Sequence, residues 1–167
     1  MTGVGTLAVI DSSALITMKV VIPIDGQWEI FKQLETLVVD GQIAMPRQVI
    51  REITEIAHPD VPGVWASGVR GRLQHPVDAD WSHLQRVMLT AGKVVDPNKT
   101  EEDADPYVLA LALHLQANGH QVRVITDDHI DRLPMRIAMT SACQLLGLTS
   151  CSCRDYLAGL GVTPLRS

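Results

Sequence analysis

The stretch Thr6-Leu7-Ala8-Val9-Ile10-Asp11-Ser12-Ser13 decides the fold that we expect for this chain. Its apolar run ends on one carboxylate and two hydroxyl residues, and a stretch typical of a helix follows. A buried strand that ends in this way delivers an Asp to the edge where open α/β sheets bind their ligands. Asp11 is therefore the first candidate for a functional acid. Because Ser and Asp are also good N-caps, the alternative is that Asp11 or Ser12 simply caps the next helix.

The composition of the chain favours one layered α/β domain over residues 1–167. A length of 167 residues suits a single core. The hydrophobic content is 46% but the aromatic content only 4%, so we expect an aliphatic core rather than a β-sandwich. The net charge of −5 argues against a protein that coats nucleic acid by charge alone. It does not exclude a nuclease, because clustered acids that bind metal lower the charge of the empty protein.

The location of the protein is expected to be cytoplasmic, without a membrane partner. No apolar stretch is long enough to span a bilayer, and the N-terminus lacks the basic patch of a signal peptide. The three cysteines are an odd number with no spacing typical of a disulfide framework, which favours a reducing compartment.

A second strand is predicted over 121–126, and it repeats the pattern of the first by ending on Asp127-Asp128. Two apolar strands joined through helices, each followed by acid, predict parallel strands with a shared crevice at their carboxyl ends. Hydroxyl groups of Ser12, Ser13 and Thr126 lie close to these acids in sequence. They could orient metal ligands or a metal-bound water.

A helix predicted over 46–57 carries another acid. With about 100° per residue, its apolar residues form one arc with Glu52 at the edge, while Glu55 points further into solvent. Glu52 is therefore expected to lie half-buried beside the sheet. The alternative is an ordinary surface glutamate that pairs with Arg51 or Arg47.

The most acidic stretch is Glu101-Glu102-Asp103-Ala104-Asp105-Pro106, and the run over 107–113 that follows is apolar all round. Such a run predicts a buried helix packed against the sheet. Asp105 before Pro106 is typical of an N-cap followed by a first-turn proline. Four acids within five residues repel one another unless a cation or solvent intervenes, and this excess favours a metal site over a simple cap.

The ligands in these segments are all carboxylates, which suit Mg²⁺ or Mn²⁺ better than zinc. No Walker loop or GxGxxG motif is present, and the six histidines show no HExxH or other paired spacing. The candidate metal ligands are Asp11, Glu52, Asp103 or Asp105, and Asp127 or Asp128.

Four segments, taken in order along the chain, resemble the PIN-domain family. Each motif is weak singly, but the four in this order are fairly specific and cover nearly the whole chain. The likeness is to standalone bacterial PIN proteins related to the VapC-type toxins of toxin–antitoxin pairs. The segments are Val9-Ile10-Asp11-Ser12-Ser13, Met45-Pro46-Arg47-Gln48-Val49-Ile50-Arg51-Glu52-Ile53, Ala104-Asp105-Pro106-Tyr107-Val108-Leu109-Ala110-Leu111-Ala112 and Val124-Ile125-Thr126-Asp127-Asp128.

The resemblance implies a Rossmann-like, three-layer α/β/α domain with a mostly parallel sheet. It also implies Mg²⁺- or Mn²⁺-dependent cleavage of an RNA substrate, an antitoxin protein as partner and a homodimer. The family's hydroxyl neighbour falls on Ser12 or Ser13. The catalytic acids implied are Asp11, Glu52, Asp105 and Asp128, with Asp127 as the alternative to the last and Asp103 as a further metal ligand.

The chain departs from the family pattern in two places. The pair Asp127-Asp128 leaves the fourth acid ambiguous, and a long helical insert over about 57–100 separates the second acid from the third. This insert could cover the site or bind a partner.

The main alternative function is a catalytically inactive PIN-like module that binds RNA or protein. A phosphatase that uses Asp11 as nucleophile is disfavoured because Ser12 and Ser13, and not a second acid, come next. The remaining alternative is a structural α/β domain whose acids are caps.

Overall fold

Four short parallel strands form the centre of the molecule. The computed structural model describes residues 5–55, 60–100, 102–162 and 165. The strand order is β2-β1-β3-β4, with every pair parallel. The two predicted strands are therefore neighbours and end at the same edge of the sheet. The strands are β1 (Leu7–Ile10), β2 (Ile43–Ala44), β3 (Val122–Ile125) and β4 (Thr149–Cys151).

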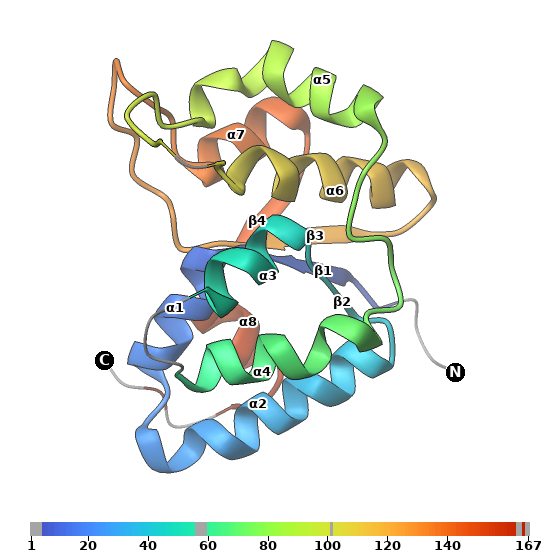
Figure 1. Cartoon of the computed structure of the whole chain (residues 1–167), viewed down its shortest axis with the longest axis vertical. Coiled ribbons are helices and arrows are strands. Elements are labelled where there is room, and N and C mark those ends of the chain that lie inside the picture. Colours follow the sequence, from blue (N-terminus) through green and yellow to red (C-terminus); the bar gives the residue numbers. More distant parts are fainter. Residues whose placement is uncertain (1–4, 56–59, 101, 163–164, 166–167) are drawn as a thin grey trace.

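Helices cover both faces of this sheet and give the expected three-layer α/β/α architecture (Figure 1). One layer consists of α1 (Ser12–Val21), α2 (Ile24–Val39), α4 (Val61–Val69) and α8 (Cys153–Gly159). The other consists of α5 (Trp81–Ala91), α6 (Asp105–Ala117) and α7 (Met139–Leu146). The short helix α3 (Arg47–Thr54) follows β2 and packs against α1 and α4.

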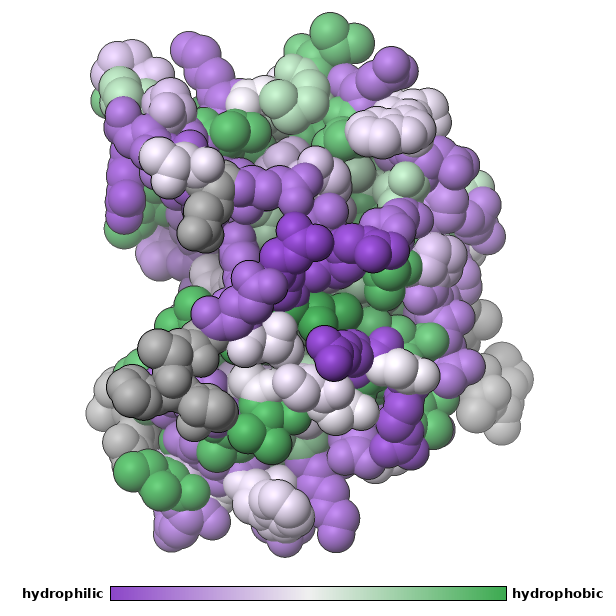
Figure 2. Space-filling view, viewed as in Figure 1, coloured by the Kyte–Doolittle hydropathy of each residue, from purple (hydrophilic) through white to green (hydrophobic). Residues whose placement is uncertain are grey.

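The core is aliphatic, as the composition predicts. All four residues of β1 are buried, as expected for a parallel strand with a helical layer on each face. Helix α6 is buried along most of its length and contacts β1 and β3. On the face shown in Figure 2, hydrophilic side chains gather in a band between the two helical layers. Among the described residues, no helix is long and apolar enough to cross a membrane.

Two expectations about helix starts are wrong. Pro46 occupies the N-cap position of α3 and not its first helical residue. Asp105 is the first residue of α6, Ala104 is the N-cap, and no side chain caps the helix. The carboxylate of Asp105 is thus not used as a cap. The predicted helix over 46–57 ends at Thr54, and its last two residues lie outside the described residues.

The segment between Glu52 and Asp105 is partly helical where the structure describes it, with irregular stretches over 73–80 and 95–100. It contains α4, α5 and two 3₁₀ turns at Arg70–Arg72 and Gly92–Val94. Helix α5 packs on α6 and α7, so this part of the segment extends the second helical layer.

Candidate functional site

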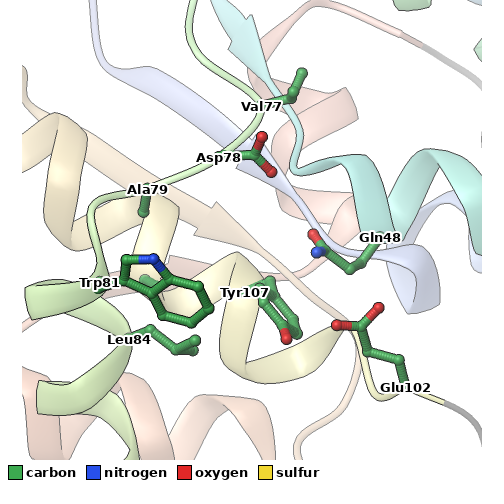
Figure 3. Close-up of a pocket in the computed structure, with 9 residues that line it drawn as sticks. Gln48, Val77, Asp78, Ala79, Trp81, Leu84, Glu102 and Tyr107 are labelled. Atoms are coloured by element: carbon green, nitrogen blue, oxygen red, sulfur yellow. The ribbon is translucent and has the colours of Figure 1, made fainter.

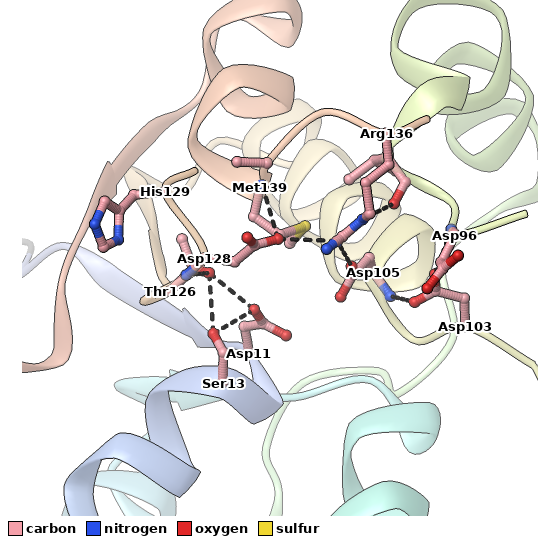
Figure 4. Close-up of polar contacts among 12 residues, drawn as sticks. Asp11, Ser13, Asp96, Asp103, Asp105, Thr126, Asp128, His129, Arg136 and Met139 are labelled. Carbon is pink, nitrogen blue, oxygen red and sulfur yellow. Dashed lines mark hydrogen bonds and ion pairs between the residues drawn. The ribbon is translucent and has the colours of Figure 1, made fainter. Parts of the chain in front are cut away.

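Asp11 lies at the carboxyl end of β1 with only 2% of its surface exposed. It holds the N-cap position of α1, yet its side chain makes no capping hydrogen bond. Instead, its Oδ2 accepts hydrogen bonds from Ser13 Oγ and Thr126 Oγ1, both at 2.8 Å (Figure 4). The interpretation of Asp11 as a simple cap is therefore wrong. The carboxylate is held in place by hydroxyls that follow two neighbouring strands.

The hydroxyl groups near Asp11 behave differently from one another. Ser13 Oγ and Thr126 Oγ1 lie 3.2 Å apart, and each also accepts a backbone N–H of the loop that follows β3. Ser12 Oγ is buried but has no hydrogen-bond partner among the described residues. Of the three predicted orienting hydroxyls, Ser13 and Thr126 thus contact the carboxylate of Asp11 and Ser12 Oγ does not.

Asp105 and Asp128 meet at one cation. Arg136 Nη2 donates to Asp105 Oδ2 at 2.7 Å and to Asp128 Oδ2 at 2.9 Å. Asp128 Oδ2 also accepts the backbone N–H of Met139 at the start of α7. The side chain of Arg136 is only 15% exposed. This bridge brings the third and fourth predicted acids to the same place from opposite ends of the chain segment 105–128.

Glu52 and Asp103 meet at a second cation. Lys99 Nζ lies 3.3 Å from Glu52 Oε1 and 3.6 Å from Asp103 Oδ1. Glu52 Oε1 also accepts the backbone N–H of Ala104 at 3.4 Å. The side chain of Glu52 is 31% exposed, so it is half-buried as the helical arc predicts. Asp103 is buried, and its two carboxylate oxygens accept backbone N–H groups of the loop leading into α6.

The alternative pairing of Glu52 with a neighbouring arginine is wrong. Arg47 makes a two-bond pair with Asp78, and Arg51 contacts Glu102 at 3.3 Å. Glu52 is thus free of both arginines, and its carboxylate faces the loop that precedes α6.

Burial and mutual repulsion act on two of these acids. Burial raises the pKa of Asp11 to about 6, with a smaller contribution from the charge of Glu52 and opposition from the hydroxyl hydrogen bonds. Burial, together with the charges of Asp11 and Asp103, raises the pKa of Asp105 to about 8 despite the nearby Arg136. Acids from segments far apart in sequence therefore lie close enough that the negative charge of one makes deprotonation of another less favourable.

The side chain of Asp127 points away from the other acids and toward α8. Its Oδ2 accepts the backbone N–H of Cys153 at 3.2 Å, at the start of α8. Its side chain makes no hydrogen bond with the other acids in the part of the chain that the structure describes. Geometry therefore favours Asp128 over Asp127 as the acid at the site.

The comparisons place the chain in a family without assigning a function. A family model described as "Domain of unknown function (DUF4411)" matches residues 9–163. The chain belongs to the DUF4411 family. No curated protein matches the chain. The matched region of this DUF4411 chain contains all six predicted acids.

The donor set at this edge of the DUF4411 domain suits a hard divalent cation. It consists of carboxylate oxygens, the ligands that Mg²⁺ and Mn²⁺ prefer, and burial raises the pKa of two of these acids, Asp11 and Asp105. Arg136 and Lys99 each contact two of the carboxylates. Among the described residues, no three of the predicted acids bring ligand oxygens within 4.8 Å of one another. The oxygens suit a divalent ion, but binding it would require the cations to move aside and the acids to close in.

Two features of the DUF4411 domain were missed by sequence reasoning. Nothing in the sequence marks Arg136, because it lies in an irregular loop before α7. Asp80, His83 and His114 form the one group of three or more potential ligands in the described residues whose ligand atoms all lie within 4.8 Å of one another. Their positions, 80, 83 and 114, give no spacing signal, and only the packing of α5 on α6 brings them together.

A pocket of about 380 Å³ adjoins the acidic site between α3, α5 and α6. Trp81 and Tyr107 line it with Gln48 and Glu102 (Figure 3). A second pocket of about 440 Å³ shares Gln48 and Glu102 and is also lined by Glu52. The two pockets together lead from an exposed aromatic side chain to one of the predicted acids.

Proposed function

We propose that this protein is a Mg²⁺- or Mn²⁺-dependent endoribonuclease, the toxin component of a toxin–antitoxin pair. The observation that carries the proposal is that Asp11, Glu52, Asp103, Asp105 and Asp128 gather near the carboxyl edge of a parallel sheet, close enough for the charge of Glu52 to act on Asp11 and for those of Asp11, Asp103 and Asp128 to act on Asp105. Burial and repulsion there raise the pKa values of Asp11 and Asp105. Carboxylic acids with such raised pKa values at a ligand-binding edge are typical of a functional site. The choice of RNA cleavage among metal-dependent activities rests on the PIN-like order of the segments.

In this proposal Asp11, Glu52, Asp105 and Asp128 would hold the metal. When bound there, it would supply water activation and charge stabilisation for the hydrolysis of a phosphodiester. Ser13 and Thr126 fix the orientation of the Asp11 carboxylate through their 2.8 Å hydrogen bonds.

The proposed substrate is single-stranded RNA that enters along the two adjoining pockets. The exposed ring of Trp81 provides a surface on which a base can stack. Arg47, Arg51 and Arg70 line a neighbouring pocket beside α3, where they could contact phosphates. Arg47 and Arg51 are paired with Asp78 and Glu102, so an RNA phosphate would have to compete with those carboxylates. An antitoxin partner, a homodimer and a cytoplasmic location complete the proposal and rest on the PIN resemblance and the composition.

A second candidate is a catalytically inactive PIN-like module that binds RNA or protein. Two cations favour it: Arg136 bridges Asp105 and Asp128, and Lys99 bridges Glu52 and Asp103. If these bridges are permanent, no divalent ion enters.

The test compares Asp11→Asn with Asp127→Asn. Both variants remove one carboxylate charge after a strand, but only the first removes it from the acid cluster. With Mn²⁺ and a labelled single-stranded RNA, we expect Asp11→Asn to lose at least about 10²-fold in cleavage rate. Asp127→Asn should keep the wild-type rate, and circular dichroism should show that both variants are folded.

Three results would decide against the proposal. Equal activity of Asp11→Asn and wild type would remove the acid cluster from the chemistry. Absence of both cleavage and Mn²⁺ binding in calorimetry would favour the inactive module. Loss of activity in Asp127→Asn alone would move the site to the α8 side of the sheet.

A further inference from the structure

A second, chemically different group of ligands lies between α5 and α6. Asp80 directly precedes α5, and His83 follows three residues later, so both side chains lie on the same side of its first turn. His114 is in the last turn of α6. From Asp105 to His114 the helix rises about 13 Å, so this group lies at the opposite end of α6 from the acidic site.

The side chains in this group are turned toward one another. Asp80 occupies an N-cap position, but its carboxylate does not cap α5. Its Oδ2 lies 3.7 Å from His114 Nδ1 instead. The rings of His83 and His114 meet edge to face with centroids 5.3 Å apart. The carboxylate of Asp80 is thus not used as a cap and is available to a ligand together with the two imidazoles.

The members of the group differ in how firmly they are held. The backbone N–H of Asp80 contacts His114 Nδ1 at 3.5 Å, and the same nitrogen lies 3.7 Å from Asp80 Oδ2. The side chain of His114 is 14% exposed, whereas that of Asp80 is 77% exposed. One ligand is thus anchored in the helix interface, and another is free to adjust from solvent.

We propose that Asp80, His83 and His114 bind one Zn²⁺, which clips α5 onto α6. Two imidazole nitrogens and one carboxylate oxygen are a ligand set that Zn²⁺ accepts, with a water molecule as the fourth ligand. Ligand atoms around a tetrahedral ion with bonds of about 2.0–2.2 Å lie roughly 3.3–3.6 Å apart. The present atoms lie within 4.8 Å of one another. Rotation of the exposed Asp80 side chain can shorten its distances to the two imidazoles, and a rotation of the His83 ring would bring its nitrogen closer to that of His114.

The chain contains a matched control for this site. His75 and His120 also meet edge to face, with centroids 5.1 Å apart. His75 Nε2 is already hydrogen-bonded to the carbonyl oxygen of Gly41, and the group of potential ligands found at α5 has no counterpart at this pair among the described residues. A pair of neighbouring histidines is thus present at both places, and the proposed ligand set only at the first.

The experiment measures Zn²⁺ binding by calorimetry on untagged protein in 5 mM Mg²⁺, on the order of the concentration that fills a weak Mg²⁺ site. We expect one Zn²⁺ per chain and a rise in the melting temperature. Asp80→Asn, His83→Gln and His114→Gln should each weaken binding at least about tenfold. The double variant His75→Gln/His120→Gln should bind as wild type does. Co²⁺ in place of Zn²⁺ should give the visible absorption of a tetrahedral site in wild type and lose it in His83→Gln.

The outcomes separate this proposal from the nuclease. Unchanged Zn²⁺ affinity in Asp80→Asn and His83→Gln, both at partly or fully exposed positions that tolerate substitution, would overturn the clip. Loss of Zn²⁺ binding in the control double variant would overturn it as well, and so would loss in Asp11→Asn. Conversely, Asp11→Asn should abolish RNA cleavage and leave Zn²⁺ binding intact, so either proposal can fail alone.

Discussion

Arg136 holds one guanidinium nitrogen against two carboxylates, Asp105 and Asp128, at 2.7 and 2.9 Å. In the metal-free protein, a cation placed in this way partly replaces a divalent ion, because it offsets the repulsion between neighbouring acids. It also competes with such an ion for the same oxygens. Arg136 is therefore the residue whose removal most directly distinguishes a latent metal site from a permanent salt bridge.

Arg136→Gln is expected to tighten Mn²⁺ binding at least about threefold, because one competing positive charge is removed from two ligands. The metal-free variant should be less stable than wild type at pH 8, because two partly buried carboxylates lose their partner. Calorimetry and urea unfolding measure the two effects. The control is Arg132→Gln in the same loop, whose exposed side chain forms no ion pair among the described residues. Weaker Mn²⁺ binding in Arg136→Gln would mean that Arg136 supports the site instead of competing for it.

The raised pKa values of Asp11 and Asp105 predict how metal-free protein responds to pH. The folded state holds these protons to about pH 6 and about pH 8, whereas an unfolded chain loses them near 4. Because the folded state binds more protons in this window, the free energy of unfolding should fall as pH rises from about 4 to 8. The melting temperature in chelator should be lower at pH 8 than at pH 5 by about 5 °C.

The control for this pH dependence is Asp105→Asn, which should flatten the upper part of the curve. The comparison is needed because burial and the neighbouring His114 lower the pKa of His83, which acts in the opposite direction near pH 6. A wild-type melting temperature that rises steadily from pH 5 to 8, by as much as in Asp105→Asn, would contradict the proton uptake.

The positions of Asp11 and Asp128 at one edge of the sheet were predictable, but the cations between the acids were not. Asp11 and Asp128 follow buried strands, and a parallel sheet brings such ends together whatever lies between them. No such rule predicts the position of Arg136, because local contacts set the path of the loop before α7 and no periodic pattern in the sequence reflects them. The same holds for His83 and His114, which meet only through the packing of two helices.

At the scale of elements, the end of β3 shows why sequence left two adjacent acids undecided. Side chains of consecutive residues in extended chain point to opposite sides. Asp128 therefore reaches Arg136 and α7 on one side, while Asp127 reaches the backbone N–H of Cys153 and α8 on the other. The sequence predicts that both acids lie at the edge of the sheet. Only the positions of α7 and α8 show which face of the sheet each side chain reaches.

Asp127→Ala is expected to destabilise α8 without touching the acid cluster. The lost hydrogen bond to the first turn of α8 should cost about 1 kcal/mol, as other lost caps do. Urea unfolding measures the loss, and hydrogen exchange should show faster exchange of the α8 amides. Ser152→Ala removes the other cap of the same helix, a hydrogen bond from the Asp155 N–H to Ser152 Oγ, and should have a similar effect. A loss of Mn²⁺ affinity in Asp127→Ala would show that the acid reaches the site after all.

Helices and strands were easier to predict than their first residues. The apolar patterns of β1, β3 and α6 identify buried elements because burial alone sets those patterns. The N-cap positions of α3 and α6 were each misplaced by one residue. In α6 the physical reason is that the Asp105 carboxylate bonds to Arg136, so a tertiary contact outweighs the local preference for capping.

At the scale of the whole molecule, the charge of the protein opposes its proposed substrate. The chain carries a net charge of −5, and the acid cluster faces the edge that RNA must approach. A phosphate backbone is repelled from such a surface until divalent cations neutralise it. Metal should therefore control binding of the substrate as well as its cleavage.

Removing metal is thus expected to weaken RNA binding by at least about tenfold. The measurement is fluorescence anisotropy of a labelled single-stranded RNA, with Ca²⁺ as an oxygen-preferring ion in one arm and chelator in the other. Ionic strength is matched between the arms, so that general screening does not account for the difference. Asp11→Asn/Asp105→Asn is the informative comparison, because it removes two ligands and, above about pH 8, two negative charges. If repulsion alone governs binding, this variant should bind RNA in chelator more tightly than wild type and respond less to Ca²⁺. Tight binding by wild type in chelator would instead mean that the arginines beside α3 hold RNA away from the acids, and the path from the pockets to Glu52 would lose its role.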